Sequence, residues 1–228
     1  MKTLPEQPIE LHRRSRVAQV GYRALSKLPF LPSSRRYNLT VCHERRFVWF
    51  RVAKVGSRTI YNVLSKGNFN LDAEHPHDIF YPVRAYQDYF KFAFVRNPWD
   101  RLVSCWHSKV VGGNYFNFSE EQLTKMREFS NFVDFVSDLN TENCDSHLRL
   151  QCRLIDLNQI DYLGRIESID QDLFEIFRIL GIPWMDLERK NVSYGRNPYW
   201  CYYDNELVEK VYRIYRRDIQ IFGYNYQV

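Results

Sequence analysis

Long apolar runs are missing from this sequence of 228 residues. A transmembrane helix needs about 20 consecutive, mostly apolar residues, and no stretch of that kind occurs, so we expect no membrane span. The first ten residues carry Pro5, Pro8 and two glutamates but no apolar centre, so a secretory signal is not expected either.

Cysteine is scarce and shows no pairing pattern. The five cysteines are odd in number, and no two stand in a Cys-x-x-Cys spacing. A disulfide scaffold is typical of much shorter chains. Cys144, His147 and Cys152 lie close together in the sequence, but no fourth ligand follows at a zinc spacing, so we expect buried thiols and no metal site.

Neither sign of charge dominates the chain. Lys and Arg number 32, Asp and Glu 27, and the net charge is +5. Hydrophobic residues make up 45%, which excludes a disordered, collagen-like or coiled-coil protein. Aromatic residues reach 16%, and basic charge with many aromatics is typical both of single-strand nucleic-acid binders and of adenine-nucleotide pockets. Composition leaves these two alternatives open.

The first 45 residues differ from the rest. They are basic and loop-like, and the spacing of Leu11 to Leu28 is that of an amphipathic helix. We expect residues 1–45 to pack on the folded domain or to extend from it. At roughly 150 residues per domain, residues 46–228 are predicted to form one domain.

Strand and helix patterns alternate after residue 45. Short runs of β-forming residues are followed by residues at helical spacing, and this order predicts an α/β fold with a central, mostly parallel sheet flanked by helices. The predicted strands are 47–50, 91–95 and 160–166.

The segment Lys54–Thr59 stands where the first predicted strand leads into a helix. Backbone N–H groups at such a junction point toward an anion, and Gly56 lets the backbone approach it closely. Lys54 precedes the glycine, so the pattern is not the Gly-x-x-x-x-Gly-Lys-Ser/Thr loop of ATPases. An ordinary Gly-Ser turn remains the alternative.

Arg96 follows the second predicted strand, and Ser104 lies eight positions later in the next helix. Ligands of parallel α/β sheets bind at the carboxyl ends of the strands, so Arg96 is placed for a second phosphate. Its alternative role is an ion pair with Asp100. Two anion sites at one sheet edge predict a ligand with two separated phosphates.

Four segments together resemble the Golgi-type carbohydrate sulfotransferases, the group that includes the chondroitin, dermatan and HNK-1 enzymes. The first resembles their 5'-phosphosulfate loop, the second their 3'-phosphate motif, and the others their last strand and C-terminal helix. The segments are Arg51–Thr59, Phe94–Ser104, Tyr162–Glu167 and Tyr215–Tyr224. The sequence departs from this pattern at Ala53, where proline is usual, and at Arg58, where a small residue is commoner.

This resemblance implies a P-loop-like sulfotransferase fold and the donor PAPS (3'-phosphoadenosine 5'-phosphosulfate), with PAP as the product. The reaction would be in-line transfer of a sulfuryl group to an acceptor hydroxyl, with Lys54 at the bridging oxygen that leaves. The donor-binding residues it implies are Lys54, Val55, Gly56, Ser57, Arg58, Thr59, Arg96 and Ser104, with Arg165 as a further contact.

A general base would assist this transfer. His75-Pro76-His77 resembles a His-x-His of the uronyl 2-O-sulfotransferases, so we take His77 as first candidate and His75 as second. A pair of surface loop histidines is the alternative, and the flanking Glu74 and Asp78 could orient the pair or replace it. His147 is a weaker candidate, for acceptor binding.

The acceptor that the resemblance implies is a sugar hydroxyl of an oligo- or polysaccharide. Some aromatic side chains could stack on sugar faces, although most are expected in the core; the candidates are Trp49, Trp184, Trp200 and Tyr199. The competing functions are a kinase-like phosphotransferase and a basic nucleic-acid-binding module. We expect a cytoplasmic bacterial enzyme, or a Golgi lumenal one if the chain is part of a longer protein.

Overall fold

The computed structural model describes residues 36–67, 69–71, 73–80, 86–184 and 197–227. The expected helix within Leu11–Leu28 lies outside these residues. The described chain forms two compact units. The first contains 36–52, 57–94 and 154–184, and the second contains 53–56, 95–153 and 197–227. The prediction of a single domain over residues 46–228 stays a prediction.

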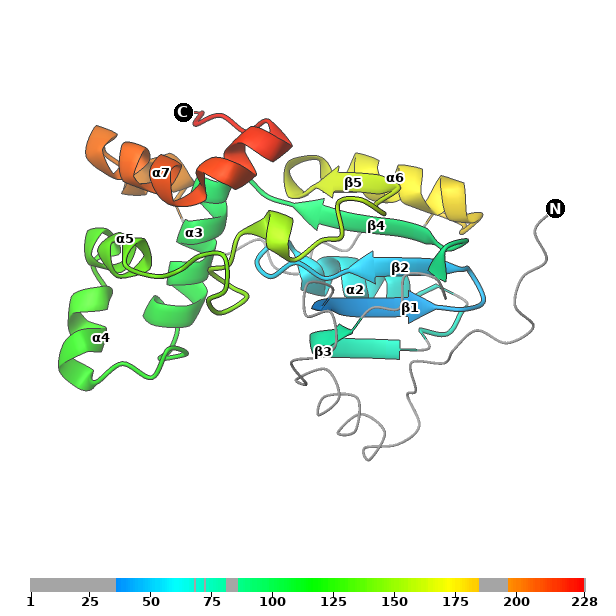
Figure 1. Ribbon diagram of the computed structural model, residues 1–228, viewed down its shortest axis with the longest axis horizontal. Helices are drawn as coiled ribbons and strands as arrows, with labels where there is room; N and C mark the ends of the chain where they lie inside the picture. Colours follow the sequence, from blue (N-terminus) through cyan, green and yellow to red (C-terminus); the bar gives the residue numbers. More distant parts are fainter. Residues whose placement is uncertain (1–35, 68, 72, 81–85, 185–196, 228) are drawn as a thin grey trace. The chain divides into compact units, whose positions relative to one another are not determined.

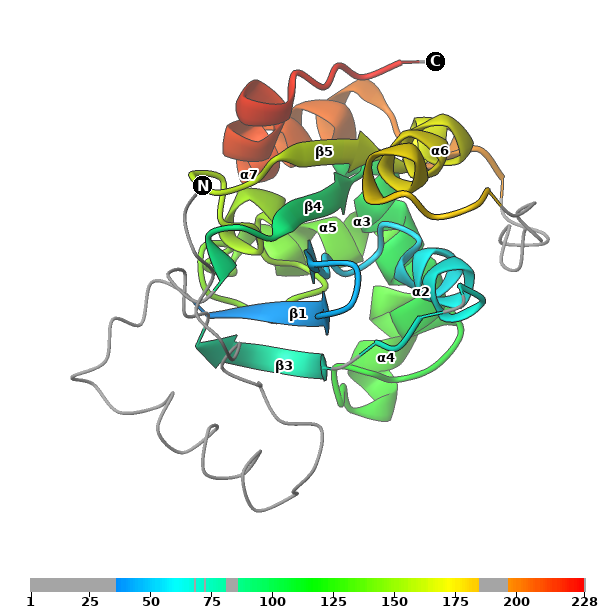
Figure 2. The same ribbon diagram turned by 90° about the vertical axis from the view of Figure 1, so that its right-hand side faces the viewer.

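A five-stranded sheet forms the first unit, in the order β3-β1-β2-β4-β5 (Figure 1). The strands are β1 (Arg36–Cys42), β2 (Phe47–Phe50), β3 (Ala73–Phe80), β4 (Phe90–Val95) and β5 (Tyr162–Arg165). The helices of this unit are α2 (Ser57–Ser65) and α6 (Ile169–Leu180). Both views place these two helices on the same face of the sheet (Figures 1 and 2). The expected α/β fold is confirmed.

The sheet is mixed rather than mostly parallel. β2 and β4 run parallel, but β1 pairs antiparallel with both β2 and β3. β1 lies within the segment that we expected to be loop-like, so the boundary at residue 45 falls inside the sheet. The strand has a signal in the sequence, because Tyr37, Leu39 and Val41 alternate with polar residues and are buried.

Aromatic side chains fill the core of the first unit. Every residue of β2 is fully buried, and the rings of Trp49 and Phe92 stack with their centroids 6.3 Å apart. β5 approaches β4 so closely that a Cβ added at Gly164 would lie 2.5 Å from the ring of Phe94. The glycine of the Leu163-Gly164-Arg165 segment is therefore required by packing. Much of the aromatic content is accounted for by the core, as expected.

The second unit is helical. It contains α3 (Pro98–Trp106), α4 (Glu120–Met126), α5 (Phe129–Ser137) and α7 (Asn205–Phe222). A π-helical turn, His107–Val111, continues α3. α3 begins as the sequence predicts, with Pro98 in its first turn and the Asn97 side chain accepting a hydrogen bond from the N–H of Trp99. α7 contacts both α3 and α5.

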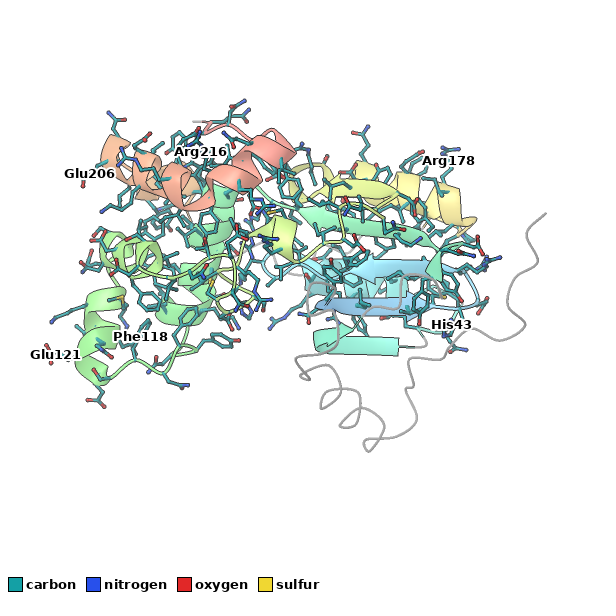
Figure 3. All side chains as sticks on the ribbon, viewed as in Figure 1. His43, Phe118, Glu121, Arg178, Glu206 and Arg216 are labelled. Carbon is teal, nitrogen blue, oxygen red and sulfur yellow. The ribbon has the colours of Figure 1, made fainter. Side chains whose placement is uncertain are left out.

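Charged side chains lie mainly on the outside of each unit. Figure 3 shows Arg178 of α6 pointing away from its helix, and likewise Glu206 and Arg216 of α7. Within the part of the chain described here, no helix is long and apolar enough to cross a membrane.

The cysteines are free thiols, and Cys42, Cys105 and Cys152 are buried while Cys201 is exposed. Burial raises the pKa of Cys105 to about 12, and burial together with the nearby Asp218 carboxylate does the same for Cys152. Cys144 is half-buried, and burial raises the pKa of its thiol as well. Since the thiolate is the reactive form, we expect Cys201 alone to react rapidly with Ellman's reagent at pH 8 in the native protein. The Cys201→Ser variant should lose the rapid phase, whereas a second rapidly reacting thiol in the native protein would contradict these burials.

Candidate active site

The loop after β2 has the backbone geometry of an anion site. Lys54 and Gly56 both have positive φ angles, 71° and 75°, and the fully buried Val55 lies between them. When the φ angles of successive residues alternate in sign, their N–H groups point toward one side of the chain and form an anion-binding concavity. A lysine in the left-handed region is also strained, and such strain concentrates at functional sites.

Two guanidinium groups hold the carbonyl groups of this loop. Arg96 Nη1 donates to the carbonyl oxygen of Lys54 at 3.2 Å, and Arg101 Nε donates to that of Ala53 at 3.0 Å. β2 and β4 run parallel, so the loop after β2 and Arg96 after β4 follow strand ends at the same edge of the sheet. Lys54 and Arg96 are therefore in direct contact, while their predicted part in holding two phosphates stays a prediction.

The ion pair that we considered for Arg96 is also present. Its Nε and Nη2 atoms lie 2.8 and 2.7 Å from Asp100 Oδ2, and the Arg96 side chain is 15% exposed. The backbone of Arg96 is fixed as well, because its N–H donates to Gln151 Oε1 and its carbonyl accepts from Gln151 Nε2, both at 2.9 Å. Arg96 is therefore a cation held in position by Asp100, Lys54 and Gln151, with a small part of its side chain exposed.

A buried carboxylate on α7 supports this arrangement. Asp218 is completely buried and accepts hydrogen bonds from the backbone N–H groups of Gln151 and Cys152 at 2.6 and 2.9 Å. Burial raises the pKa of Asp218, although these hydrogen bonds and the charge of Arg101 act in the opposite direction. Asp218 thus fixes Gln151, which in turn fixes the backbone of Arg96.

The Lys54 side chain has a partner that the sequence did not reveal. Lys54 Nζ donates to Ser108 Oγ at 2.5 Å, and Ser108 lies in the π-helical turn that follows α3. Ser104, the serine that the sequence singled out, is half-buried one turn earlier on α3. Lys54, Arg96, Ser104 and Ser108 all belong to the second unit.

Val55 and Gly56 also belong to the second unit, whereas the other predicted donor-binding residues, which are Ser57, Arg58, Thr59 and Arg165, belong to the first. Ser57 begins α2, and its hydroxyl donates to the carbonyl oxygen of Val52 at 2.6 Å. This hydrogen bond joins the residues on either side of the loop 53–56. Arg58 is exposed and Thr59 half-buried in the same first turn. Arg165 ends β5, and its backbone N–H donates to Asp172 Oδ2 at 2.8 Å. Their part in donor binding stays a prediction.

His75 and His77 lie in β3, an edge strand, rather than in a surface loop. His75 pairs with Leu39 of β1, which itself pairs with Phe50, the last residue of β2. The β1–β3 register shifts at Pro76 to Asp78, and proline within sheets is confined to edges and such irregularities. The backbone of the His-x-His segment is therefore level with the end of β2. The side chains of β3 lie outside the described residues.

The aromatic candidates for sugar stacking divide clearly. Trp49 is fully buried, so it cannot stack on an acceptor. Trp184 and Trp200 are 37% and 40% exposed, and Tyr199 is half-buried with its hydroxyl donating to the carbonyl oxygen of Gln227. Among the described side chains, no group of three His, Cys, Asp or Glu could hold a metal ion.

Sequence patterns did not assign roles to Arg101, Gln151 or Asp218. Arg101 lies in the 3'-phosphate-like motif and Asp218 in the C-terminal segment, but only the fold shows that both side chains are buried. For Asp218 a signal was available, because the residues three and four positions away on its helix, which are Ile214, Tyr215, Ile221 and Phe222, are all apolar or aromatic.

Comparisons with known proteins show the family to which the chain belongs. Carbohydrate sulfotransferase 12 of Mus musculus is 24% identical over 168 residues, which cover 60% of this chain and 40% of the relative. The protein of the same name from Xenopus laevis is 26% identical over 168 residues, with the same coverage. The chain thus matches less than half the length of these relatives. No solved structure matches the chain significantly. The profile of the sulfotransferase family matches residues 37–225, well over half of the sequence, and the chain belongs to that family.

Proposed function

We propose that this protein transfers the sulfuryl group of PAPS to a hydroxyl group of a carbohydrate. The observation that carries the proposal is the strained loop at the end of β2, whose carbonyls are held by Arg96 and Arg101 and whose lysine reaches Ser108. The curated relatives are named carbohydrate sulfotransferases, which supports a carbohydrate as the acceptor.

The transfer is a single displacement at the sulfur atom. A bond forms from the acceptor oxygen to sulfur while the bond from sulfur to the bridging oxygen breaks, and PAP leaves with the negative charge. Lys54 neutralises that charge, and preorganised donors of this kind act where charge develops. Arg96 and Ser104 hold the 3'-phosphate, and the backbone N–H groups of the loop hold the 5' end.

The acceptor proton passes to a base, and a histidine suits this task near neutral pH. The sequence nominates His77 first and His75 second, and this remains a prediction.

Transfer of radiolabelled sulfate from PAPS tests the proposed activity. The purified full chain would be incubated with ³⁵S-labelled PAPS and a panel of unsulfated glycans that includes chondroitin, dermatan and neutral oligosaccharides. We expect label in at least one glycan, and loss of that label when excess PAP competes. The absence of labelled product with every glycan, in protein shown to be folded, would contradict the proposal.

Arg96→Ala is expected to weaken PAP binding by about 10- to 100-fold, because a hydrogen bond to a charged group contributes about 1.5–3 kcal/mol. The loop should lose support at the Lys54 carbonyl as well. Isothermal titration with PAP measures the effect. Arg213→Ala removes an exposed arginine that pairs with Glu209 on α7, and it should leave the affinity unchanged. Equal affinity in both variants would remove Arg96 from the donor site.

Family membership favours sulfuryl transfer over the kinase-like and nucleic-acid-binding alternatives. A cytoplasmic bacterial location, with the Golgi lumen as its alternative, remains a prediction.

A further inference from the structure

A hydrogen-bonded histidine and aspartate lie in the segment between α5 and α7. His147 Nδ1 is 2.8 Å from Asp145 Oδ1, and the backbone N–H of His147 donates to the same oxygen at 2.9 Å. The Tyr115 hydroxyl donates to Asp145 Oδ2 at 3.1 Å. The Tyr115 ring meets the imidazole edge to face, with centroids 4.8 Å apart. The imidazole is thus held by the carboxylate and by the tyrosine ring.

This arrangement determines which nitrogen of His147 carries the proton. Burial acts to raise the pKa of Asp145, but the hydrogen bonds from His147 and Tyr115 outweigh it and lower the pKa to about 2. The ionised carboxylate accepts a hydrogen bond, so Nδ1 is the protonated nitrogen and Nε2 carries the lone pair. Among the described residues, none makes a hydrogen bond to Nε2. A base oriented by a carboxylate in this way recurs in nucleophile activation.

Arg101 joins this segment to the lysine loop. Its Nη2 donates to the carbonyl oxygen of Ser146 at 3.0 Å, while its Nε donates to that of Ala53. The residues beside these two carbonyls are His147 and Lys54. The buried guanidinium of Arg101 therefore binds the backbone directly before His147 and directly before Lys54.

The π-helical turn provides a second connection. Lys54 Nζ donates to Ser108, and the next residue, Lys109, places its Nζ 3.8 Å from the centroid of the Tyr115 ring. Tyr115 in turn contacts both Asp145 and His147. All these residues belong to the second unit, so the network does not depend on how the two units are placed.

We propose that His147, oriented by Asp145 and Tyr115, is the general base that takes the proton from the acceptor hydroxyl. This inference rests on the proposed function. The proton moves from the acceptor oxygen to Nε2 as that oxygen bonds to sulfur, and the imidazolium is stabilised by Asp145. The side chain of His147 is 20% exposed and Tyr115 is 44% exposed, so an acceptor can reach them from solvent.

The test compares three histidine variants in the labelled PAPS assay. His147→Ala should lower transfer by about 10²- to 10⁴-fold, the usual contribution of a general base. Its affinity for PAP, measured by titration, should stay within about threefold of wild type, since no donor contact is lost. Added imidazole should restore part of the activity of His147→Ala, which a merely structural role would not allow. His107→Ala, which changes another histidine of the second unit, is the matched control and should retain activity.

His77→Ala decides between the two candidate bases. A large loss of transfer in His77→Ala, with His147→Ala still active, would overturn the proposal and leave His77 as the base. Loss of activity in His147→Ala without rescue by imidazole and with weakened PAP binding would also overturn it. If the wild type labels no glycan, the proposed function fails and this inference fails with it. If His147→Ala labels glycans as efficiently as the wild type does, His147 is not the base, although the proposed function still stands.

Discussion

Lys54→Ala is expected to lower sulfuryl transfer by about 10³-fold while PAP affinity falls by no more than about tenfold. Removing one preorganised donor from a site of developing charge costs about 10²- to 10³-fold in rate, and the ammonium group carries a full charge. The effect should fall mainly on turnover, because the charge on the bridging oxygen develops only as the sulfuryl group leaves.

The substitution is a clean test because it leaves the backbone conformation unchanged. Alanine keeps the Cβ, so the strain of a positive φ at position 54 is the same in both proteins. The substitution removes the hydrogen bond from Lys54 Nζ to Ser108 Oγ. Lys125→Ala, which removes an exposed lysine paired with Glu121 on α4, is the matched control. Turnover of Lys54→Ala within tenfold of wild type would contradict the role of Lys54.

Arg101→Met is expected to lower the free energy of unfolding by about 3–5 kcal/mol, because it leaves three carbonyl acceptors without their donor at about 1–3 kcal/mol each, partly offset by the buried methionine. The Arg101 side chain is 2% exposed and donates to three carbonyl oxygens, those of Ala53, Ser146 and Arg149. Methionine fills similar space but donates nothing, so all three acceptors lose a charged donor.

Urea unfolding measures this effect. Arg101→Lys should lie between wild type and methionine, because an ammonium group keeps the charge but cannot match the planar fork of a guanidinium. The exposed Arg216→Met variant on α7 should change stability by no more than about 0.5 kcal/mol. Wild-type stability in Arg101→Met would show that the guanidinium does not hold the loop.

The elements that the sequence predicted well are those whose signal is local. β2 and β4 are short runs of buried β-forming residues, and the start of α3 is marked by Asn97 and Pro98. β1 was missed because basic residues and prolines near it dominated the composition, although its alternation is visible afterwards. The antiparallel pairing of β1 is a tertiary outcome that no local pattern predicts.

The candidate site was predicted in part, for the same reason. Lys54 and Arg96 stand in contiguous motifs, and their proximity follows from the parallel strands. The contacts that hold them involve residues far away in the sequence, such as Gln151 and Asp218, and depend on how α7 folds. The partner of Lys54 was missed because Ser108 lies in a π-helical turn, one turn beyond the serine that the motif suggested.

Titration of the full chain with PAP tests the donor site most directly, because it requires neither the acceptor nor the base to be known. We expect one PAP to bind per chain, and we expect Arg96→Ala to weaken the binding while Arg213→Ala does not. A folded wild-type protein that shows no binding of PAP would contradict the donor site, and with it the proposed sulfuryl transfer.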